Sequence, residues 1–386
     1  DYHRREQRPV WRQRRDWLDA PSWDLSEDER CLGGCAKPTL VSEPVGKRST
    51  RSVFELSFAT PQITKLQSGD AVALRDDKAF TSMRASVVDV DLVRGKVQVL
   101  CNEVPQTCSI IPDDYVNHAP LPQAISRNLR GLLESSSRSP LRSFVGRERP
   151  TFVGVETEGD LLKPFDGSAV EAIRALAKGS VLAVQGPPGT GKTRLAAEAL
   201  SALMKDGKRV AVAAPGHATI AHCLSKALDK IDGDVLCVKV GSRRRASADD
   251  PETALAARSN VITKPRWDAK LAKELDTELP VLLGATAWAL ARDDAVGTFD
   301  YLFVDEAGQV PAANLAAMAS CASRIVLLGD QAQLPAPCRG AHDEGGASSC
   351  LEHYVGGEEL SEDRGVFLGV TYRLHPLLCG AISELM

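Results

Sequence analysis

The sequence predicts an α/β protein in which a parallel sheet with helices on both faces follows a small antiparallel β-barrel and a helical stalk. Two observations predict this order of parts. Between residues 50 and 102, apolar and polar residues alternate in several short stretches, with no helical period among them. From residue 161 onward, continuous apolar runs of strand length alternate with stretches of helical period. Continuous apolar strands are typical of parallel sheets that crossover helices cover on both faces.

Length and composition limit the classes of protein to consider. The chain has 386 residues and a mass of 41.4 kDa, which suggests two or three domains. A net charge of −4 and a pI near 6.1 exclude a protein that binds nucleic acid over its whole surface, so any such contact must be a local groove. No apolar run reaches the ~18 residues that span a bilayer. Because no secretory segment stands at the start either, we expect no membrane contact.

The cysteines predict a reducing compartment. Ten cysteines are spread from Cys31 to Cys379 in a chain too large to need disulfides, so we expect free thiols in the cytoplasm. Only Cys31 and Cys35 are closely spaced, and a structural zinc site needs four ligands. A metal site at this pair is therefore disfavoured.

We expect residues 1–45 to be a linker or tail. Six arginines alternate with Trp11 and Trp17 in the first 17 residues, and acidic residues follow. Arginine beside tryptophan can stack on bases or bind phosphates. A linker helix that packs on the body of the protein is the favoured interpretation.

An accessory β-barrel is expected over residues 46–119. Residues 88–92 and 96–100 alternate on either side of Arg94-Gly95, a pattern typical of a hairpin. Several such strands without a helix indicate a small antiparallel barrel. A stalk helix and a connection are expected over residues 120–160, since four apolar residues share one helical face: Ile125, Leu129, Leu132 and Leu133.

The first sheet domain is expected over residues 161–365, and residues 366–386 would start a truncated second one. Helical stretches, most clearly 192–204 and 218–228, separate the strand-like runs. These runs are 181–184, 210–214, 235–240, 281–284, 301–304 and 325–328.

A phosphate-binding loop follows the first of these runs. The pattern G-x-x-x-x-G-K-[ST] places successive backbone N–H groups and a helix N-terminus around phosphates. Lys192 would reach the β- and γ-phosphates, and the Thr193 hydroxyl would ligate Mg²⁺. The loop consists of Gly186, Pro187, Pro188, Gly189, Thr190, Gly191, Lys192 and Thr193.

An acidic pair follows the run 301–304. At the end of a parallel strand, Asp305 would lie beside the loop and hold Mg²⁺, while Glu306 would orient and deprotonate the attacking water. Gln333, after the run 325–328, could hydrogen-bond the γ-phosphate, although Gly-Asp followed by prolines is also an ordinary turn. Loop and pair together predict an ATP hydrolase.

Four segments resemble motifs I, II, III and IV of superfamily-1 helicases in order and spacing. They are Gly186–Thr193, Asp305–Gln309, Gly329–Leu334 and Thr371–Pro376. The resemblance is to the branch that moves 5′ to 3′, which includes flap-nuclease and nonsense-mediated-decay helicases. It implies a P-loop RecA-like domain after a barrel and stalk, with ATP and Mg²⁺ as cofactors.

The resemblance also implies a single-stranded nucleic acid as partner, with DNA favoured over RNA. Residues 214–224 look like motif Ia, so Pro215, Gly216 and His217 would contact the strand, and Thr286 stands where the family has a strand-touching threonine. Arg373 of motif IV would reach the γ-phosphate. The opening residues resemble the junction of bacterial fusions with a RecB-like nuclease, which implies a nuclease domain on the same full-length chain.

Two departures from the family pattern bear on the expected activity. Asp166 stands where the family has a glutamine that reads adenine, which leaves the base preference open. Motifs V and VI do not occur in these 386 residues, so this chain alone should hydrolyse ATP weakly, because an arginine finger contributes ~10³–10⁵ in rate. The leading hypothesis is an ATP-driven single-strand translocase. The alternatives are an RNA helicase of the same branch and a nucleotide-gated strand-binding clamp.

Overall fold

The computed structural model describes residues 1–43, 50–113, 120–156, 160–241, 250–334, 337–343, 345–356 and 360–372. The chain divides into two compact units. The barrel unit comprises residues 4–117 with 339–341, and the sheet unit comprises residues 1–3, 118–338 and 342–386. No helix in the described ranges combines the length and the apolar character needed to cross a membrane.

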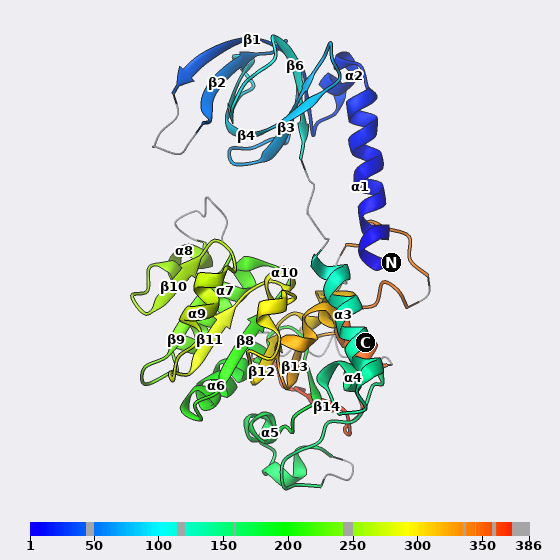
Figure 1. Cartoon of the computed structure of the whole chain (residues 1–386), viewed down its shortest axis with the longest axis vertical. Helices are drawn as coiled ribbons and strands as arrows, with labels where there is room; N and C mark the ends of the chain where they lie inside the picture. The colour runs from blue at the N-terminus through cyan, green and yellow to red at the C-terminus, as the bar shows by residue number, and fades with distance from the viewer. Residues whose placement is uncertain are drawn as a thin grey trace. The chain divides into compact units, whose positions relative to one another are not determined.

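The barrel unit is built around a closed antiparallel barrel with the strand order β1-β2-β5-β4-β3-β6 (Figure 1). Alternate residues point inward, among them Leu56, Val72 and Val97, which are fully buried. The predicted hairpin is confirmed, since Asp91 pairs with Lys96 across the turn. The strands are β1 (Leu32–Ser42), β2 (Ser52–Ser57), β3 (Ala71–Asp76), β4 (Ser82–Asp91), β5 (Lys96–Cys101) and β6 (Thr107–Pro112).

The first barrel strand lies in the stretch for which the sequence predicted only a linker or tail. β1 starts at Leu32, and its residues Leu32 and Cys35 are buried opposite Ile110 and Cys108 of β6. The barrel therefore starts earlier than residue 46. The physical reason is that β1 closes the barrel between β2 and β6, although its start, Leu-Gly-Gly-Cys, has no alternating pattern.

Two helices precede the barrel, α1 (Tyr2–Asp19) and α2 (Ser22–Glu27). Arg75, which is 1% exposed, donates hydrogen bonds to the carbonyl oxygens of Trp17, Leu18 and Ala20. These carbonyls lie at the end of α1, where backbone acceptors lack helical partners. A buried guanidinium thus ties the end of α1 to the barrel.

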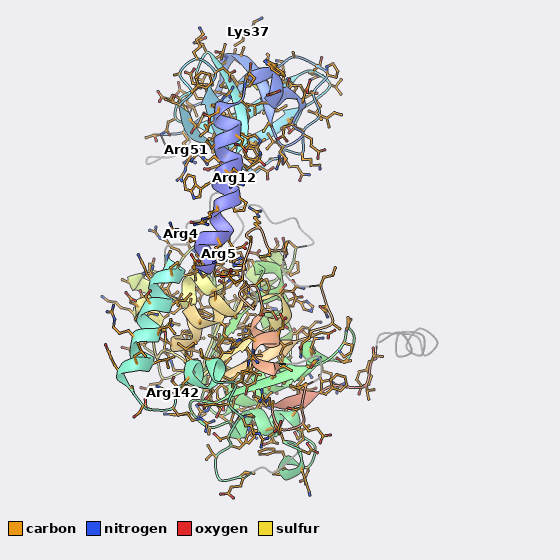
Figure 2. All side chains as sticks on the ribbon, turned by 90° about the vertical axis from the view of Figure 1, so that its right-hand side faces the viewer. Arg4, Arg5, Arg12, Lys37, Arg51 and Arg142 are labelled. Carbon is orange, nitrogen blue, oxygen red and sulfur yellow. The ribbon has the colours of Figure 1, made fainter. Side chains whose placement is uncertain are left out.

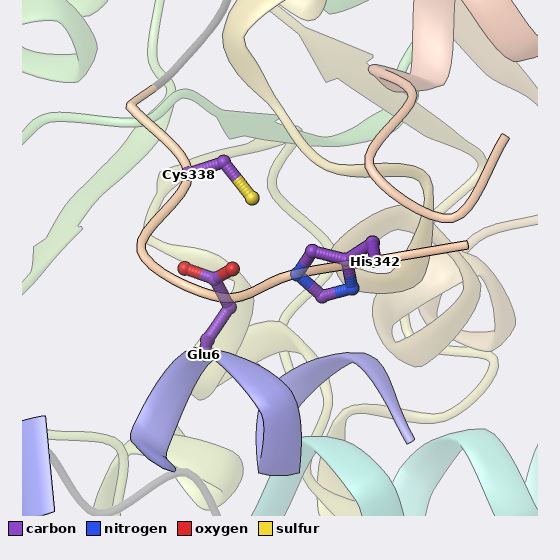
Figure 3. Close-up of side chains that lie close together, drawn as sticks. All are labelled: Glu6, Cys338 and His342. Carbon is purple, nitrogen blue, oxygen red and sulfur yellow. The ribbon is translucent and has the colours of Figure 1, made fainter. Parts of the chain in front are cut away.

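The start of α1 is tied to a distant loop of the same unit. Glu6 accepts hydrogen bonds from the N–H groups of Arg339 and Gly340, at 3.0 and 2.9 Å. Figure 3 shows Glu6 on α1. A Cβ at Gly340 would lie 2.6 Å from the carbonyl oxygen of Arg5, so the loop packs tightly on the helix. Both ends of α1 are therefore fixed within the barrel unit.

The sheet unit contains an eight-stranded parallel sheet of order β10-β9-β11-β8-β12-β13-β7-β14 (Figure 1). This confirms the predicted parallel sheet after a barrel. Six strands coincide with the predicted apolar runs: β7 (Val181–Gln185), β8 (Arg209–Ala213), β9 (Leu236–Val240), β11 (Val281–Gly284), β12 (Tyr301–Val304) and β13 (Ile325–Gly329). The edge strands β10 (Val261–Lys264) and β14 (Gly365–Phe367) were not predicted, because they are short and lack a continuous apolar run.

Helices cover both faces of the sheet and enclose two hydrophobic cores. Along β7, Leu182 and Val184 face one core, while Val181 and Ala183 face the other. The first face carries α5 (Ala169–Ala175), α6 (Lys192–Lys205), α7 (His217–Leu228) and α8 (Pro251–Ala256). The second face carries α3 (Pro120–Glu134), α4 (Pro140–Val145), α9 (Ala269–Glu274), α10 (Ala287–Leu290), α11 (Ala312–Met318) and α12 (Cys350–Val355). Short 3₁₀ turns are η1 (Lys163–Phe165), η2 (Asp293–Ala295), η3 (Ala307–Gln309) and η4 (Ala319–Cys321).

Helix α3, in the stretch predicted as a stalk, packs through only part of the predicted apolar face, since Ile125 and Leu132 are half-buried against the core. Leu121, Ala124 and Asn128 are buried, whereas Leu129 and Leu133 are 43% and 90% exposed. The Asn128 side chain donates to the carbonyl oxygens of Ala316 and Ala317 at the end of α11, at 2.8 and 2.9 Å. These polar contacts decide how α3 docks, and an apolar pattern does not reveal them.

Substitution of Gly284 by alanine should destabilise the sheet unit. A Cβ at this position in β11 would lie 2.5 Å from Ile220 Cγ2 and 2.6 Å from Leu224 Cδ1 of α7. Overpacking of this kind costs about 1–3 kcal/mol, which urea unfolding would measure as a lower midpoint. Gly131→Ala is the matched control, since nothing lies within 4 Å of its Cβ in α3, and it should stabilise the helix by about 0.5–1 kcal/mol. An unchanged midpoint for Gly284→Ala would contradict the close packing of α7 on β11.

Candidate nucleotide site

The phosphate-binding loop joins β7 to α6 at the carboxyl edge of the sheet. The N–H of Gly186 donates to Gly329 O at 3.0 Å, which ties the loop to the end of the neighbouring strand β13. Gly189 and Gly191 have φ values of 86° and 90°, a conformation that favours glycine. Gly191 is the N-cap of the 14-residue helix α6. The loop thus presents backbone N–H groups and a helix N-terminus, which together bind anions.

Two polar side chains of the loop form hydrogen bonds with its own backbone. Thr190 Oγ1 donates to Pro187 O at 2.8 Å. Lys192 Nζ donates to Gly186 O and to Pro187 O, the latter at 3.1 Å. The Lys192 ammonium therefore lies over the centre of the loop.

The acidic pair ends β12. Asp305 is 7% exposed, and its Oδ1 accepts a hydrogen bond from the N–H of Glu306 at 2.9 Å. Burial raises the pKa of Asp305 to about 6, although that hydrogen bond and the Lys192 ammonium act in the opposite direction. Glu306 has φ 52° and ψ 44°, a left-handed conformation that costs a non-glycine residue about 1–3 kcal/mol and is concentrated at functional sites.

Loop, acidic pair and Gln333 line one cleft of about 820 Å³ in the sheet unit. Lys192, Thr193, Asp305, Glu306 and Gln333 all contribute to its wall. The close approach of the turns that carry these side chains needs Gly308, where a Cβ would lie 2.5 Å from Asp330 O. The predicted catalytic residues that the structure describes are therefore brought together. Arg373 lies outside the described residues.

Part of the cleft wall was missed by sequence reasoning. Ala218, Thr219 and His222 of α7, Pro251 at the start of α8, and Tyr372 also line the cleft. The sequence did not assign these residues to the cleft. Those of α7 and α8 reach it through helix packing, whereas Tyr372 is placed by its N–H, which donates to Gly189 O at 2.9 Å. Asp166, in contrast, is exposed, adopts φ 49° and does not line the cleft.

The predicted strand-binding residues lie outside the wall of this cleft, just after two neighbouring strands. Pro215, Gly216 and His217 follow β8, and Thr286 follows β11, which pairs with β8 in parallel. None of the four lines the nucleotide cleft. Because parallel strands end at the same edge, the four residues share the carboxyl edge of the sheet with the cleft.

His217 is held by a buried lysine that the sequence analysis did not single out. Lys239 of β9 is 2% exposed, and its Nζ lies 2.9 Å from His217 Nδ1. Burial lowers the pKa of Lys239 to about 8, while the carboxylate of Glu252 acts to raise it. An ammonium can only donate, so Nδ1 accepts and the neutral ring carries its proton on Nε2. The signal in the sequence was a lone charge inside the apolar run 235–240.

Comparison with known proteins gives the class to which this architecture is similar. The AAA-domain family matches residues 167–344. The matched segment includes the phosphate-binding loop, the acidic pair and Gln333. The DNA replication ATP-dependent helicase/nuclease DNA2 of Mus musculus is 25% identical over 396 residues, which cover 96% of this chain. The chain spans about a third of that relative, namely 35% of its length. The predicted resemblance to superfamily-1 helicases of the 5′-to-3′ branch is thereby confirmed.

Solved helicase structures are similar at lower identity. The arterivirus nonstructural protein 10 (helicase) is 15% identical, with 95% of this chain and 60% of that chain covered at a TM-score of 0.37. Bacteroides sp Pif1 in complex with ADP-AlF4 is 16% identical, with 53% and 42% covered at a TM-score of 0.26.

Asp305→Asn should stabilise the protein in the absence of nucleotide and Mg²⁺. The carboxyl titrates near pH 3.8 when unfolded and near pH 6 when folded, so stability falls as pH rises through that window and the loss persists above it. The neutral amide avoids this loss and should be up to about 3 kcal/mol more stable at pH 7, with the difference vanishing below about pH 4. Urea unfolding at both pH values checks the prediction. Exposed Asp276→Asn is the control, and equal effects of the two substitutions would contradict the burial of Asp305.

Proposed function

We propose that this chain is the motor part of an ATP-driven translocase that moves along single-stranded nucleic acid, with DNA as the strand. The observation that carries the proposal is the single cleft that Lys192, Thr193, Asp305, Glu306 and Gln333 line together. A phosphate cradle beside an acidic pair is the arrangement by which P-loop enzymes hydrolyse nucleoside triphosphates. The similarity to a helicase/nuclease supports the choice of a strand as partner.

The residues of the cleft fit ATP and Mg²⁺. The loop and the N-terminus of α6 offer N–H donors to phosphates, and the Lys192 ammonium supplies a positive charge. Thr193 and Asp305 are the proposed Mg²⁺ ligands, since hydroxyl and carboxylate oxygens suit this ion. The high pKa of Asp305 agrees with this role, because its buried carboxylate gains from a cation. Bound Mg²⁺ would neutralise charge on the phosphates.

Each polar side chain then has a defined task. Lys192 binds and orients the β- and γ-phosphates. Glu306 accepts the proton of the attacking water, and its left-handed backbone fixes the direction of its Cα–Cβ bond. Gln333 hydrogen-bonds the γ-phosphate, and we place Arg373 opposite as a further positive charge. His217 and Thr286, with Pro215 and Gly216, contact the backbone of the strand.

We further propose a nuclease domain and a cytoplasmic location. We place a nuclease domain on the same full-length protein, since the curated relative is named a helicase/nuclease and the match covers 35% of it. We also place the protein in the cytoplasm, since each cysteine in the described ranges is a free thiol.

ATP hydrolysis by the full-length protein, with and without single-stranded DNA or RNA, tests the proposal. We expect single-stranded DNA to stimulate hydrolysis more than RNA does. A strand with a blocked 5′ end then distinguishes the direction of movement. Greater stimulation by RNA would indicate an RNA helicase. Nucleotide-dependent strand binding without stimulated hydrolysis would indicate a clamp and contradict the motor.

A further inference from the structure

Helix α1 carries a stripe of positive charge that the proposed motor does not use. Its 18 residues include six arginines and three acidic residues. Arg4, Arg8, Arg12 and Arg15 are exposed, and at 100° per residue they share a sector of about 80° of the helix. Figure 2 shows Arg4 and Arg12 on this helix. We call these four residues the arginine stripe.

The stripe is not neutralised within the described residues. No ion pair or hydrogen bond engages the four side chains there, whereas Arg14 on another side of α1 pairs with Asp113. Asp16 and Asp19 are exposed near the C-terminal end of the helix and reduce the local charge only there. A row of cations without counter-charges attracts a polyanion.

The barrel unit holds the stripe in a fixed orientation. Trp17 is 6% exposed and belongs to the opposite side of α1, which packs against Leu25, Ala73 and Ile111. Near the start of α1, Glu6 accepts hydrogen bonds from two backbone N–H groups of residues 339–340. At its end, Arg75 donates to the Trp17 carbonyl oxygen. Because the helix is fixed at both ends, a ligand of the stripe does not have to order it, which lowers the cost of binding.

The spacing of the stripe suits a single strand of nucleic acid. At 1.5 Å per residue, Arg4 and Arg15 lie about 16 Å apart along the helix. At the stacked spacing of 3.4 Å per nucleotide, this length corresponds to about five phosphates. Trp11, which is 51% exposed, lies at the margin of the same face and offers a ring on which a base can stack.

We propose that the arginine stripe is a second binding surface for single-stranded nucleic acid, with the four guanidinium groups on phosphates and Trp11 on a base. This inference deepens the proposed function, because it assigns a partner surface outside the sheet unit. A membrane is the less suitable occupant. A helix that lies on a membrane buries a broad apolar face, whereas Trp11 is the exposed large apolar residue of the described α1.

Binding of fluorescein-labelled oligothymidylate to the nucleotide-free protein, measured by anisotropy over a salt series, tests the stripe. The stripe variant changes Arg4, Arg8, Arg12 and Arg15 to glutamine, which preserves helix propensity. Each lost phosphate contact should reduce the slope of log K against log salt by about 0.7, so four should reduce it by up to about 3. We expect the affinity of the stripe variant to fall at least 10-fold near 50 mM salt.

A control with the same change of net charge isolates the effect of position. It changes four exposed cations on separate elements to glutamine: Lys78, Arg130, Lys226 and Arg266. We expect its salt slope to stay close to wild type. Equal losses in stripe and control variants would overturn the proposal. The single variant Arg8→Gln should still reduce the slope by about 0.7, which keeps the test valid if the stripe variant does not fold.

Three further measurements identify the occupant. Trp11→Ala should weaken oligothymidylate binding about 5- to 150-fold without a change in salt slope. Polyglutamate and phosphatidylserine vesicles should lose less affinity than oligothymidylate in the stripe variant, since only the general attraction between charges is removed for them. A loss for either ligand equal to that for oligothymidylate would overturn the assignment to nucleic acid. Because no nucleotide is present, these results do not depend on whether the protein hydrolyses ATP.

Discussion

Glu306→Gln should lower strand-stimulated ATP hydrolysis by the full-length protein about 10²- to 10⁴-fold, the usual contribution of a general base. The amide has the size of the carboxylate but cannot take a proton from water. Both side chains must accept the same left-handed backbone, with φ 52° in the structure, so the geometry of the turn should not change. Steady-state phosphate release measures the effect.

The affinity for Mg-ATP should remain nearly unchanged in Glu306→Gln, because Lys192, Thr193 and the N–H groups of the loop are intact. Glu278→Gln is the matched control, since it removes one exposed carboxylate of the sheet unit that does not line the cleft. If Glu306→Gln turned over ATP as fast as the wild type, Glu306 would not be the general base. The proposed function as an ATP-driven motor would then be excluded as well. An equal loss in Glu278→Gln would indicate an effect of charge rather than of position.

The chemistry of the cleft could be predicted from the sequence because short-range rules determine it. Gly189 and Gly191 permit the loop geometry, and a helix must start at Lys192 for its N–H groups to point at a phosphate. Asp305 follows a buried strand, and parallel strands end at one edge, so its place beside the loop follows from the order of the elements. None of these features depends on how side chains pack.

Features that depend on distant partners could not be predicted in this way. β1 is a strand because β2 and β6 pair with it, although Gly33 and Gly34 weaken any local preference for a strand. Asn128 docks α3 through two carbonyl groups almost two hundred positions away. His222 lines the cleft only because α7 packs beside the loop. Lys239 was visible as a charge inside an apolar run, but its contact with His217 was not.

Lys192→Ala should weaken Mg-ATP binding to this chain about 10- to 150-fold, which corresponds to the ~1.5–3 kcal/mol of a hydrogen bond to a charged group. In the structure, Lys192 Nζ lies over the loop, where it donates to Gly186 O and Pro187 O. Removal of the ammonium takes away the charge that faces the phosphates but leaves the N–H groups of the loop in place. Titration calorimetry with Mg-ATP measures the affinity.

Arg194→Ala is the matched control for Lys192→Ala. Arg194 lies two residues further along α6, pairs with Glu198 at 3.0 Å and does not line the cleft, so its loss removes the same charge from the same helix. We expect its affinity for Mg-ATP to stay close to wild type. Stabilisation by a ligand grows with the ratio of its concentration to Kd. Nucleotide should therefore raise the unfolding temperature of wild type and Arg194→Ala by similar amounts. It should raise the unfolding temperature of Lys192→Ala much less. Equal affinity of Lys192→Ala and wild type would mean that nucleotide binds elsewhere, and the cleft would lose its assignment.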